Sequence, residues 1–552
     1  MLKVVTAKEM QELDRRATAE YGIPSLLLME HAGAETAREI REAFPAASGG
    51  RVVVLCGRGN NGGDGFVVSR QLLARGARVE TFLLARPEQV KGDARLNLEI
   101  LEKLGAAPTQ ITEASGLGAL AEHVAAADLV VDALLGTGTR GPAEGLFAEA
   151  IQAVNRAGRR VVAVDIPSGL IADSPEAAGP VVRADLTVTF ALPKPCLLLH
   201  PAAGYAGSVR VADIGIPRVL LRDPTLPVGL LEAADVAAAF PPRDPASHKG
   251  TFGHVLVVAG SVGKTGAAAL CALAAQRGGA GLVTLGVPES LNDILEVKLT
   301  EVMTEPLPET EARTLAGEAL KPLLALAEGK DAVAIGPGLT THPSTRQLVC
   351  DLLTTLRLPM VVDADGINAL ALEGRAEILA RATGPVILTP HPGELSRLLR
   401  LSRTELLTRR ISVAREAAVA HRMTLVLKMA RSLIAGPGGE VAIVPTGNPG
   451  MATGGTGDVL TGLIAGLLAQ GAAPGLAAHA GVYVHGLAGD LAAARLGQEA
   501  MLAGDLLDCL PQAIRQVKTG KIVRQFGSSG VRQFGDPEGT AEQPNSRTAE
   551  RF

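Results

Sequence analysis

The 552-residue sequence has no large excess of either charge, no paired cysteine motif and no long uncharged apolar run. Its 53 lysines and arginines nearly balance 57 aspartates and glutamates, so the composition does not predict a nucleic-acid partner. The five cysteines are scattered and odd in number, which argues against a zinc site or disulfide framework and favours a reducing compartment. No apolar window reaches the ~18 residues of a membrane span, and the charged N-terminus lacks the apolar region of a signal peptide. We therefore expect a cytoplasmic protein without a membrane partner.

Short β-branched runs alternate with stretches of helical length, which is typical of α/β folds with mainly parallel sheets covered by helices. The chain is too long for one core, and segments rich in proline and charge at 217–229 and 241–250 predict a boundary between two domains. We place these domains at 1–220 and 230–517 and expect the tail 518–552 to be disordered. The predicted strands are 51–56, 77–84, 128–134, 160–166 and 184–190, then 254–260, 332–336, 359–365, 385–390 and 424–429.

The stretch GRGNNGGDG, residues 57–65, follows the first predicted strand. Gly57, Gly59 and Gly62 match the dinucleotide-binding pattern G-x-G-x-x-G, in which a pyrophosphate lies over a helix N-terminus. However, a carboxylate at Asp64 would repel a phosphate in the same place. The residues alone therefore leave open a loop shaped for a sugar hydroxyl or a metal ion instead.

Polar clusters follow three of the predicted strands: Asn60–Asp64, Asp132 with Gly136–Pro142, and the DIPSG motif at 165–169. Alone, each aspartate could cap a helix and each glycine run could form a turn. Because loops at the carboxyl ends of parallel strands converge on one crevice, the three together predict a ligand site.

In these motifs, and over nearly all of residues 10–215, the chain resembles the bifunctional NAD(P)H-hydrate repair enzymes, whose N-terminal half is an NAD(P)HX epimerase of Rossmann-like fold. One departure is His31, where the family usually has asparagine. The resemblance implies a potassium site at Asn61, Asp132 and Ser168, whose oxygen atoms suit a hard monovalent cation. Asp165 is the candidate acid/base for exchanging the R and S hydrates, and Lys194 is a second candidate. The implied contacts to the hydrated cofactor are Asn60, Asn61, Gly62, Gly63, Asp64, Gly136, Thr137, Gly138, Thr139, Arg140, Gly141, Pro142 and Asp165.

In the second half, GSVGKTG at 260–266 fails as a phosphate-binding P-loop because Val258 stands where its first glycine is required. A stronger signal is the run Gly454–Gly457, which opens an apolar segment of helical period and would present backbone N–H groups to an anion. Asp458, next in the chain, could then take a proton from a hydroxyl group. The alternative is a glycine-rich helix start in which Asp458 is only an early helix acid.

Over nearly all of residues 230–515 the chain resembles the ADP-dependent NAD(P)HX dehydratases of ribokinase-like fold. The nucleotide segment departs from the family form K-G-x-x-T, because Met429 replaces its glycine. The resemblance implies hydrate contacts at Ala267, Gly338, His391 and Asp458, and AMP contacts at Lys428, Met429, Ala430, Arg431, Ser432 and Gly457.

The predicted function is repair of hydrated nicotinamide cofactors: an isomerase exchanges R- and S-NAD(P)HX, and a lyase dehydrates the S epimer with ADP, releasing AMP and phosphate. K⁺ is expected in the first domain and Mg²⁺ with ADP in the second, although the sequence shows no ligand set for Mg²⁺. Two alternatives are a vitamin or sugar kinase of ribokinase-like type and a non-catalytic sensor of NAD-like ligands. We also expect a homo-oligomer.

Overall fold

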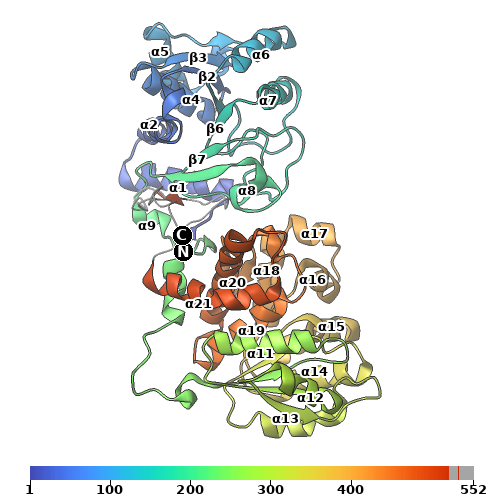
Figure 1. Cartoon of the computed structure of the whole chain (residues 1–552). Coiled ribbons are helices and arrows are strands. Elements are labelled where there is room, and N and C mark those ends of the chain that lie inside the picture. Colours follow the sequence, from blue (N-terminus) through green and yellow to red (C-terminus); the bar gives the residue numbers. More distant parts are fainter. Residues whose placement is uncertain (521–531, 534–552) are drawn as a thin grey trace, which may run out of the picture.

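The computed structural model describes residues 1–520 and 532–533 and consists of two α/β lobes stacked end to end (Figure 1). Helix α21 (Ala503–Thr519) includes the first residues of the tail predicted to be disordered, and the rest of that tail, apart from 532–533, lies outside the described residues. Within the described ranges, no helix is long and apolar enough to cross a membrane.

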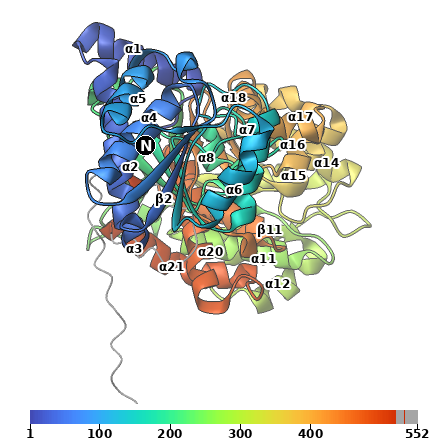
Figure 2. The same ribbon diagram turned by 90° about the horizontal axis from the view of Figure 1, so that it is seen from above.

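The sheet of the first lobe is parallel throughout, with the order β19-β8-β7-β6-β5-β2-β3-β4. Its strands are β2 (Arg51–Cys56), β3 (Arg78–Leu83), β4 (Thr109–Gln110), β5 (Leu129–Ala133), β6 (Arg160–Val164), β7 (Leu186–Phe190), β8 (Ser208–Ala212) and β19 (Arg532–Gln533). Alternate strand residues face opposite sides, so Val52 and Val54 enter one core and Val53 and Leu55 another. Helices α2 (Ser25–Ala43), α4 (Asn60–Leu73) and α5 (Gly92–Lys103) cover the first face, and α6 (Leu117–Ala125) and α7 (Gly145–Ala157) cover the second (Figure 2).

The sheet of the second lobe has the order β1-β9-β18-β17-β16-β15-β14-β13-β10-β11-β12 and is parallel from β12 to β16. Its strands are β1 (Leu2–Lys3), β9 (Val228–Leu230), β10 (His254–Val258), β11 (Leu282–Pro288), β12 (Met303–Leu307), β13 (Ala332–Ile335), β14 (Met360–Val362), β15 (Val386–Leu388), β16 (Thr424–Leu427), β17 (Leu433–Ala435) and β18 (Val441–Ile443). The predicted α/β class, with mainly parallel sheets, is confirmed, and all ten predicted strands are present in whole or in part.

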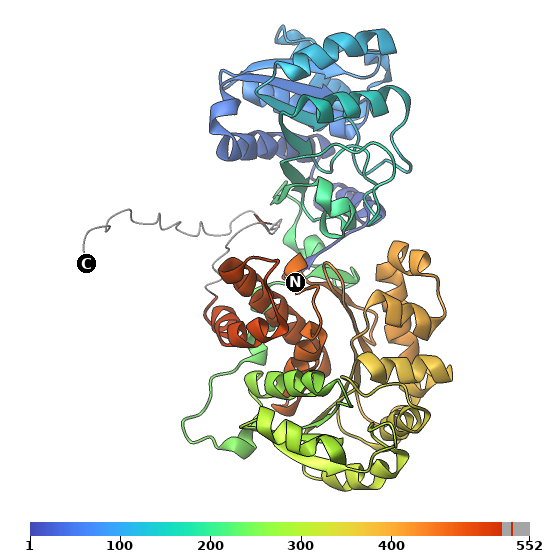
Figure 3. The same ribbon diagram turned by 45° about the vertical axis from the view of Figure 1, so that its right-hand side comes forward.

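Helices cover both faces of this second sheet as well (Figure 3). One face carries α11 (Thr265–Arg277), α12 (Asn292–Lys298), α19 (Thr456–Ala469), α20 (Pro474–Leu496) and α21. The other face carries α13 (Leu320–Leu326), α14 (Pro343–Thr355), α15 (Ala364–Glu373), α16 (Pro392–Leu399), α17 (Arg403–Thr408) and α18 (Arg410–His421).

The first residues of the chain belong to the second sheet, which the sequence did not predict. Strand β1 pairs antiparallel with β9 at the sheet edge, and Val4 packs in the core of the second lobe. Helix α1 (Ala7–Tyr21) then begins at Thr6, whose hydroxyl accepts from the backbone N–H of Glu9 in a capping box. Its residues Met10 and Leu13 pack in the core of the first lobe, so the N-terminal segment connects both lobes.

Among the parallel strands of each sheet the strand order reverses once, between β2 and β5 in the first lobe and between β10 and β13 in the second. At such a reversal, the loops at the carboxyl ends of the two central strands diverge and leave a crevice in which ligands bind. The predicted residues of the first site follow β2, β5 and β6, and those of the second follow β10, β13, β15 and β16 or lie at the start of α19.

Candidate active sites

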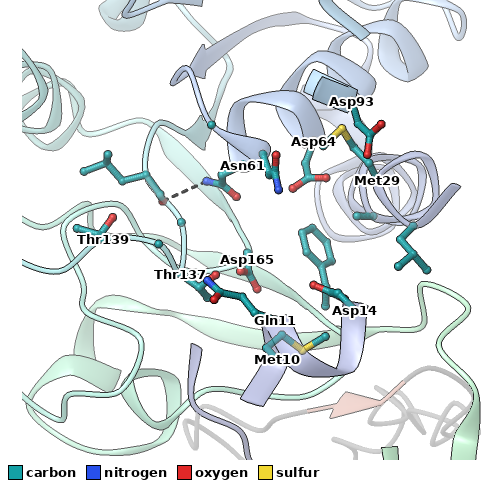
Figure 4. Close-up of a pocket in the computed structure, with 18 of the residues that line it drawn as sticks. Met10, Gln11, Asp14, Met29, Asn61, Asp64, Asp93, Thr137, Thr139 and Asp165 are labelled. Atoms are coloured by element: carbon teal, nitrogen blue, oxygen red, sulfur yellow. Dashed lines mark hydrogen bonds between the residues drawn. The ribbon is translucent and has the colours of Figure 1, made fainter. Parts of the chain in front are cut away.

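The crevice of the first lobe lies between the loop after β2 and the loop after β5. Helix α4 starts at Asn60, directly after Gly59, and the Asn61 amide donates to the Leu135 carbonyl at 3.1 Å (Figure 4). A Cβ at Gly62 would meet the Gly57 carbonyl oxygen at 1.9 Å, so this glycine allows the tight turn into α4. Arg58–Asn61 and Asp64 of the GRGNNGGDG loop form one wall of a cavity of about 620 Å³.

Two groups of predicted residues differ in their position around this cavity. Among the described residues, the lining includes Asn60, Asn61, Asp64, Gly136, Thr137, Gly138, Thr139 and Asp165. The other predicted contacts are not among the lining residues. Gly62 and Gly63 are buried, and Arg140, Gly141 and Pro142 lie outside the lining. His31 also lies outside the lining, since its Nδ1 atom contacts the Ile214 carbonyl at 3.0 Å.

Asp165 and Lys194 form an ion pair at the base of the cavity. The Lys194 side chain is 1% exposed, and its Nζ donates to Oδ1 of Asp165 at 2.6 Å. Thr189 donates to the same oxygen at 3.0 Å, whereas no hydrogen bond to Oδ2 occurs among the described residues. Asp165 has a φ of 64°, a left-handed conformation that is strained for a residue with a Cβ and is often found at functional sites. The second candidate from the sequence, Lys194, is thus placed beside the first.

Asp64 lies in the same cavity (Figure 4). Burial, followed by the neighbouring charge of Asp165, holds the pKa of Asp64 well above its usual range. The protonated form of this carboxyl is therefore favoured. Because that form is neutral, Asp64 would repel a phosphate less than its sequence position suggested.

Behind the cavity, Asp132 is fully buried at the end of β5. Its carboxylate accepts from the Ser168 backbone at 2.8 Å and from the Ser168 hydroxyl at 2.6 Å. Burial raises the pKa of Asp132 to about 6, against these hydrogen bonds, which lower it. Asn61 Oδ1 is buried and has no hydrogen-bond partner in the described part of the chain.

In the second lobe, the loops after β10 and β13 meet in the corresponding way. Ser261 donates to the Gly338 carbonyl at 2.6 Å. Gly338 has a φ of 67°, and a Cβ there would lie 3.3 Å from that of Ala267 and 2.9 Å from that of Lys264. The structure thus brings the two predicted hydrate contacts, Ala267 and Gly338, together.

Asp458 lies in the first turn of α19, facing a buried polar network. Nζ of Lys428 donates to Oδ1 of Asp363 at 2.6 Å, and Thr461 donates to Oδ2 of Asp363 at 2.7 Å. Burial, then the charge of Asp363, raises the pKa of Asp458 to about 7, while Lys428 lowers it. A carboxyl that titrates near neutral pH can serve as a general base. Asp363 was missed as a site residue, although it directly follows strand β14.

Lys428 also connects this network to the predicted nucleotide segment. A Cβ at Gly457 would lie 3.2 Å from Lys428 Nζ, so the ammonium group lies beside the N-terminus of α19. In the segment that follows Lys428, the Ser432 hydroxyl accepts a hydrogen bond from the Met429 backbone N–H at 3.4 Å. Arg431, with a φ of 62°, donates to the Pro445 carbonyl. A backbone turn therefore forms here without the glycine of the family pattern.

His391 has a structural role that the sequence did not predict. Its Nδ1 atom accepts from the backbone N–H groups of Gly393 and Glu394 at 3.0 and 3.3 Å and caps α16. Burial, then Lys428, lowers the pKa of His391, so its neutral form is favoured. The ring is half exposed beside the polar network of Asp363.

Two α/β lobes, each with polar and charged groups gathered near the carboxyl ends of its parallel strands, indicate a bifunctional nucleotide-binding enzyme. Residues 25–196 match the model of the YjeF-related protein N-terminus, and residues 255–512 match that of the NAD(P)H-hydrate dehydratases. A bifunctional NAD(P)H-hydrate repair enzyme of Moorella thermoacetica is 50% identical over 93% of this chain and 97% of its own length. One from Thermofilum pendens is 42% identical over 94% of this chain and 97% of its own. The chain belongs to the family of bifunctional NAD(P)H-hydrate repair enzymes.

Among solved structures, an ADP/ATP-dependent NAD(P)H-hydrate dehydratase of Bacillus subtilis, co-crystallised with ATP and Mg²⁺, is 35% identical. The match covers 52% of this chain and 99% of the Bacillus subtilis chain, with a TM-score of 0.46.

Proposed function

We propose that the cavity of the first lobe exchanges the R and S epimers of NAD(P)HX, and that the second site dehydrates the S epimer with ADP, yielding NAD(P)H, AMP and phosphate. The observation that supports this division most directly is that each lobe gathers acid/base groups near the carboxyl ends of its parallel strands. In the first lobe these are Asp165 with Lys194, and in the second Asp458 with Asp363 and Lys428. Residues 1–220 and 230–517 are the proposed domains, although strand β1, at the start of the first, pairs in the sheet of the second.

In the second site, the chemical problem is that hydroxide leaves poorly from C6 of the reduced ring. Asp458 takes the hydroxyl proton as the oxygen attacks the β-phosphorus of ADP, and AMP departs. The phosphorylated hydroxyl then leaves as phosphate, and loss of a proton from C5 restores the ring double bond. The backbone N–H groups at the start of α19 and the ammonium group of Lys428 face the transferring phosphoryl charge, which is where such transfer needs stabilisation.

The proposed ligand assignments follow the same geometry. Lys428–Ser432 and Gly457 bind the AMP part of the nucleotide, and Ala267, Gly338 and His391 hold the hydrate. Mg²⁺ is proposed to enter with ADP. No group of three His, Cys, Asp or Glu side chains suited to a metal occurs in the described residues.

Potassium is proposed to bind Asn61, Asp132 and Ser168. The partnerless buried oxygen of Asn61 fits this assignment, since a cation would satisfy it. Asp132 is buried among neutral donors, and a cation would offset its charge. When bound, the ion would supply electrostatic anchoring for the loops after β2, β5 and β6.

A kinase that releases a stable phosphorylated vitamin or sugar is not favoured, because the relatives named above act in hydrate repair along the whole chain. The full-length protein should restore NADH absorbance completely from mixed NADHX epimers with ADP. The Asp165→Asn protein should stop with the R epimer unconverted, and the Asp458→Asn protein should still exchange epimers without forming NADH. A stable phosphorylated end product, or no turnover by the wild-type protein, would contradict the proposal.

A further inference from the structure

Helix α1 places a carboxyl group in the epimerase cavity that the sequence motifs did not indicate. Met10, Gln11 and Asp14 all line the cavity, because residues three and four apart share one side of a helix. Leu13 and Ala17 hold the adjacent side of α1 in the core, and the Thr6 capping box and strand β1 fix its start. Asp14 therefore faces the cavity from the side opposite the loops of the sheet (Figure 4).

The Asp14 carboxyl has no hydrogen bond or ion pair within residues 1–520, a feature that it shares with Asp64 but not with Asp93 or Asp165. Asp93 accepts from the Ser25 hydroxyl at 2.6 Å, and Asp165 accepts from Lys194 and Thr189 through Oδ1. A partly buried carboxyl without a protein partner is free to bond to a ligand. Burial raises the pKa of Asp14 to about 6, while Lys194 lowers it and Asp165 raises it.

We propose that Asp14 is a second catalytic residue of the epimerase site and acts as the acid that complements Asp165 as the base. This inference rests on the proposed epimerase function and names a residue for the same cavity. An acid and a base on different walls of one cavity can act on two atoms of the hydrated ring at once.

The reaction that this pair would catalyse is the opening and reclosing of the ring. Oδ2 of Asp165 takes the proton of the C6 hydroxyl, and C6 becomes an aldehyde as its bond to N1 breaks. The electron pair of that bond goes to N1, which receives the proton of Asp14. After rotation about the C5–C6 bond, N1 adds to the other face of the aldehyde, and both protons return to the groups from which they came.

Asp14 is a better candidate for this acid than Asp64. Asp64 is 8% exposed and its pKa is held well above its usual range by burial, so it holds its proton and suits a permanent hydrogen-bond donor. The groups that face Asp14 from the neighbouring elements are Asp64 on α4, Asp165 after β6 and Lys194 before the short helix α8 (Pro195–Leu198).

The test compares Asp14→Asn, Asp14→Glu and the control Glu12→Gln in the full-length chain. Glu12 lies on the same helix but is exposed and paired with Arg15. Purified R-NADHX is incubated without ADP, and both epimers are followed by chromatography. Asp14→Asn should lower kcat for epimerisation by ~10²–10⁴, with KM changed little, and Asp14→Glu should recover part of the rate. Glu12→Gln should equal the wild type.

The pH profile separates catalysis from a structural role. Because the acid must carry its proton, the wild-type kcat/KM should fall as pH rises through about 6, and Asp14→Asn should lack this decline. Turnover of S-NADHX with ADP by the same preparations reports folding of the second lobe. Undiminished epimerisation by Asp14→Asn, a loss confined to KM, or a wild-type profile without the decline overturns the assignment of Asp14. Absence of epimerisation in the wild type would instead overturn the proposed function.

Discussion

Lys428 donates from Nζ to Oδ1 of Asp363 at 2.6 Å, beside the helix turn that carries Asp458. Asp363 is 1% exposed and its other oxygen accepts from Thr461, so both carboxylate oxygens have partners. The Lys428 side chain is still 21% exposed, which leaves its ammonium group accessible to a phosphate. This ion pair thus has three roles. It stabilises the fold, it influences the pKa of Asp458, and it belongs to the proposed nucleotide site.

Replacement of Lys428 by alanine should be costly, because it leaves Asp363 buried without its cation. Removal of one partner of a buried pair typically costs about 3–5 kcal/mol. We expect a loss of this size in the free energy of unfolding measured with urea, together with weaker ADP binding. Lys264→Ala is the matched control: Lys264 pairs with Asp365 but its side chain is 46% exposed. That variant should change the free energy of unfolding by no more than about 1 kcal/mol, and equal losses in both would contradict the special role of Lys428.

Replacement of Asp458 by asparagine should lower kcat for dehydration by ~10²–10⁴ and leave the Kd for ADP nearly unchanged. The side chain keeps its size but no longer accepts a proton. Asp293→Asn, an exposed acid in the first turn of α12, provides the control and should be silent. Asp458 is not the base if kcat falls less than tenfold, and loss of ADP binding would favour its role as an early helix acid.

The pKa of Asp458 predicts two pH effects of opposite direction. Since the base must be ionised, wild-type kcat should fall as pH decreases below about 7. The folded-state pKa is raised, so the protonated form favours folding, and this contribution is lost as pH rises through about 7. At pH 8, Asp458→Asn should therefore be more stable than the wild type by up to about 4 kcal/mol, and near pH 3 the two proteins should be equal. Urea unfolding at both pH values measures the difference.

The positions of the glycine-rich loops, of the central strands and of Asp165, Asp132 and Asp458 along them could be predicted, because strand, loop and helix start follow one another within a few residues. Asp14 could not, since α1 reaches the cavity only through tertiary packing against the first lobe. The Asp363–Lys428 pair joins residues far apart in the chain, which follow β14 and β16, and the local pattern does not determine the order of these strands in the sheet. Strand β1 was missed because a two-residue edge strand has no periodicity.

Potassium should increase both the stability and the epimerase rate of the protein. If Asn61, Asp132 and Ser168 bind K⁺, replacing KCl by choline chloride at equal ionic strength should lower the Tm of the first lobe and slow epimerisation. Asp132→Asn should abolish this difference, since the charge that attracts the ion is removed. Dehydration of S-NADHX by that variant should be unchanged. The same response to K⁺ in wild type and Asp132→Asn would place the ion elsewhere.

Arg410 links the two lobes. It lies at the start of α18, is 3% exposed, and donates to the His200 carbonyl at 2.7 Å and to Glu176 at 3.3 Å, both in the first lobe. The segment that ends at His200 begins with Lys194, the partner of Asp165, and includes α8. A contact made by the second lobe therefore holds one end of the segment that positions the epimerase lysine.

Arg410→Ala should consequently reduce epimerase activity several-fold, although the residue belongs to the dehydratase half of the chain. Loss of the charged donor removes its hydrogen bond to the His200 carbonyl, at a cost of about 1.5–3 kcal/mol in the free energy of unfolding. Calorimetry should then separate the unfolding of the two lobes. Arg409→Ala is the neighbouring control: Arg409 is half exposed and pairs only with Glu405 and Glu416 among the described residues, so it should cost less than about 1 kcal/mol and leave both activities intact. If Arg410→Ala lowers dehydration while epimerisation is unaffected, the contact stabilises α18 alone and does not position Lys194.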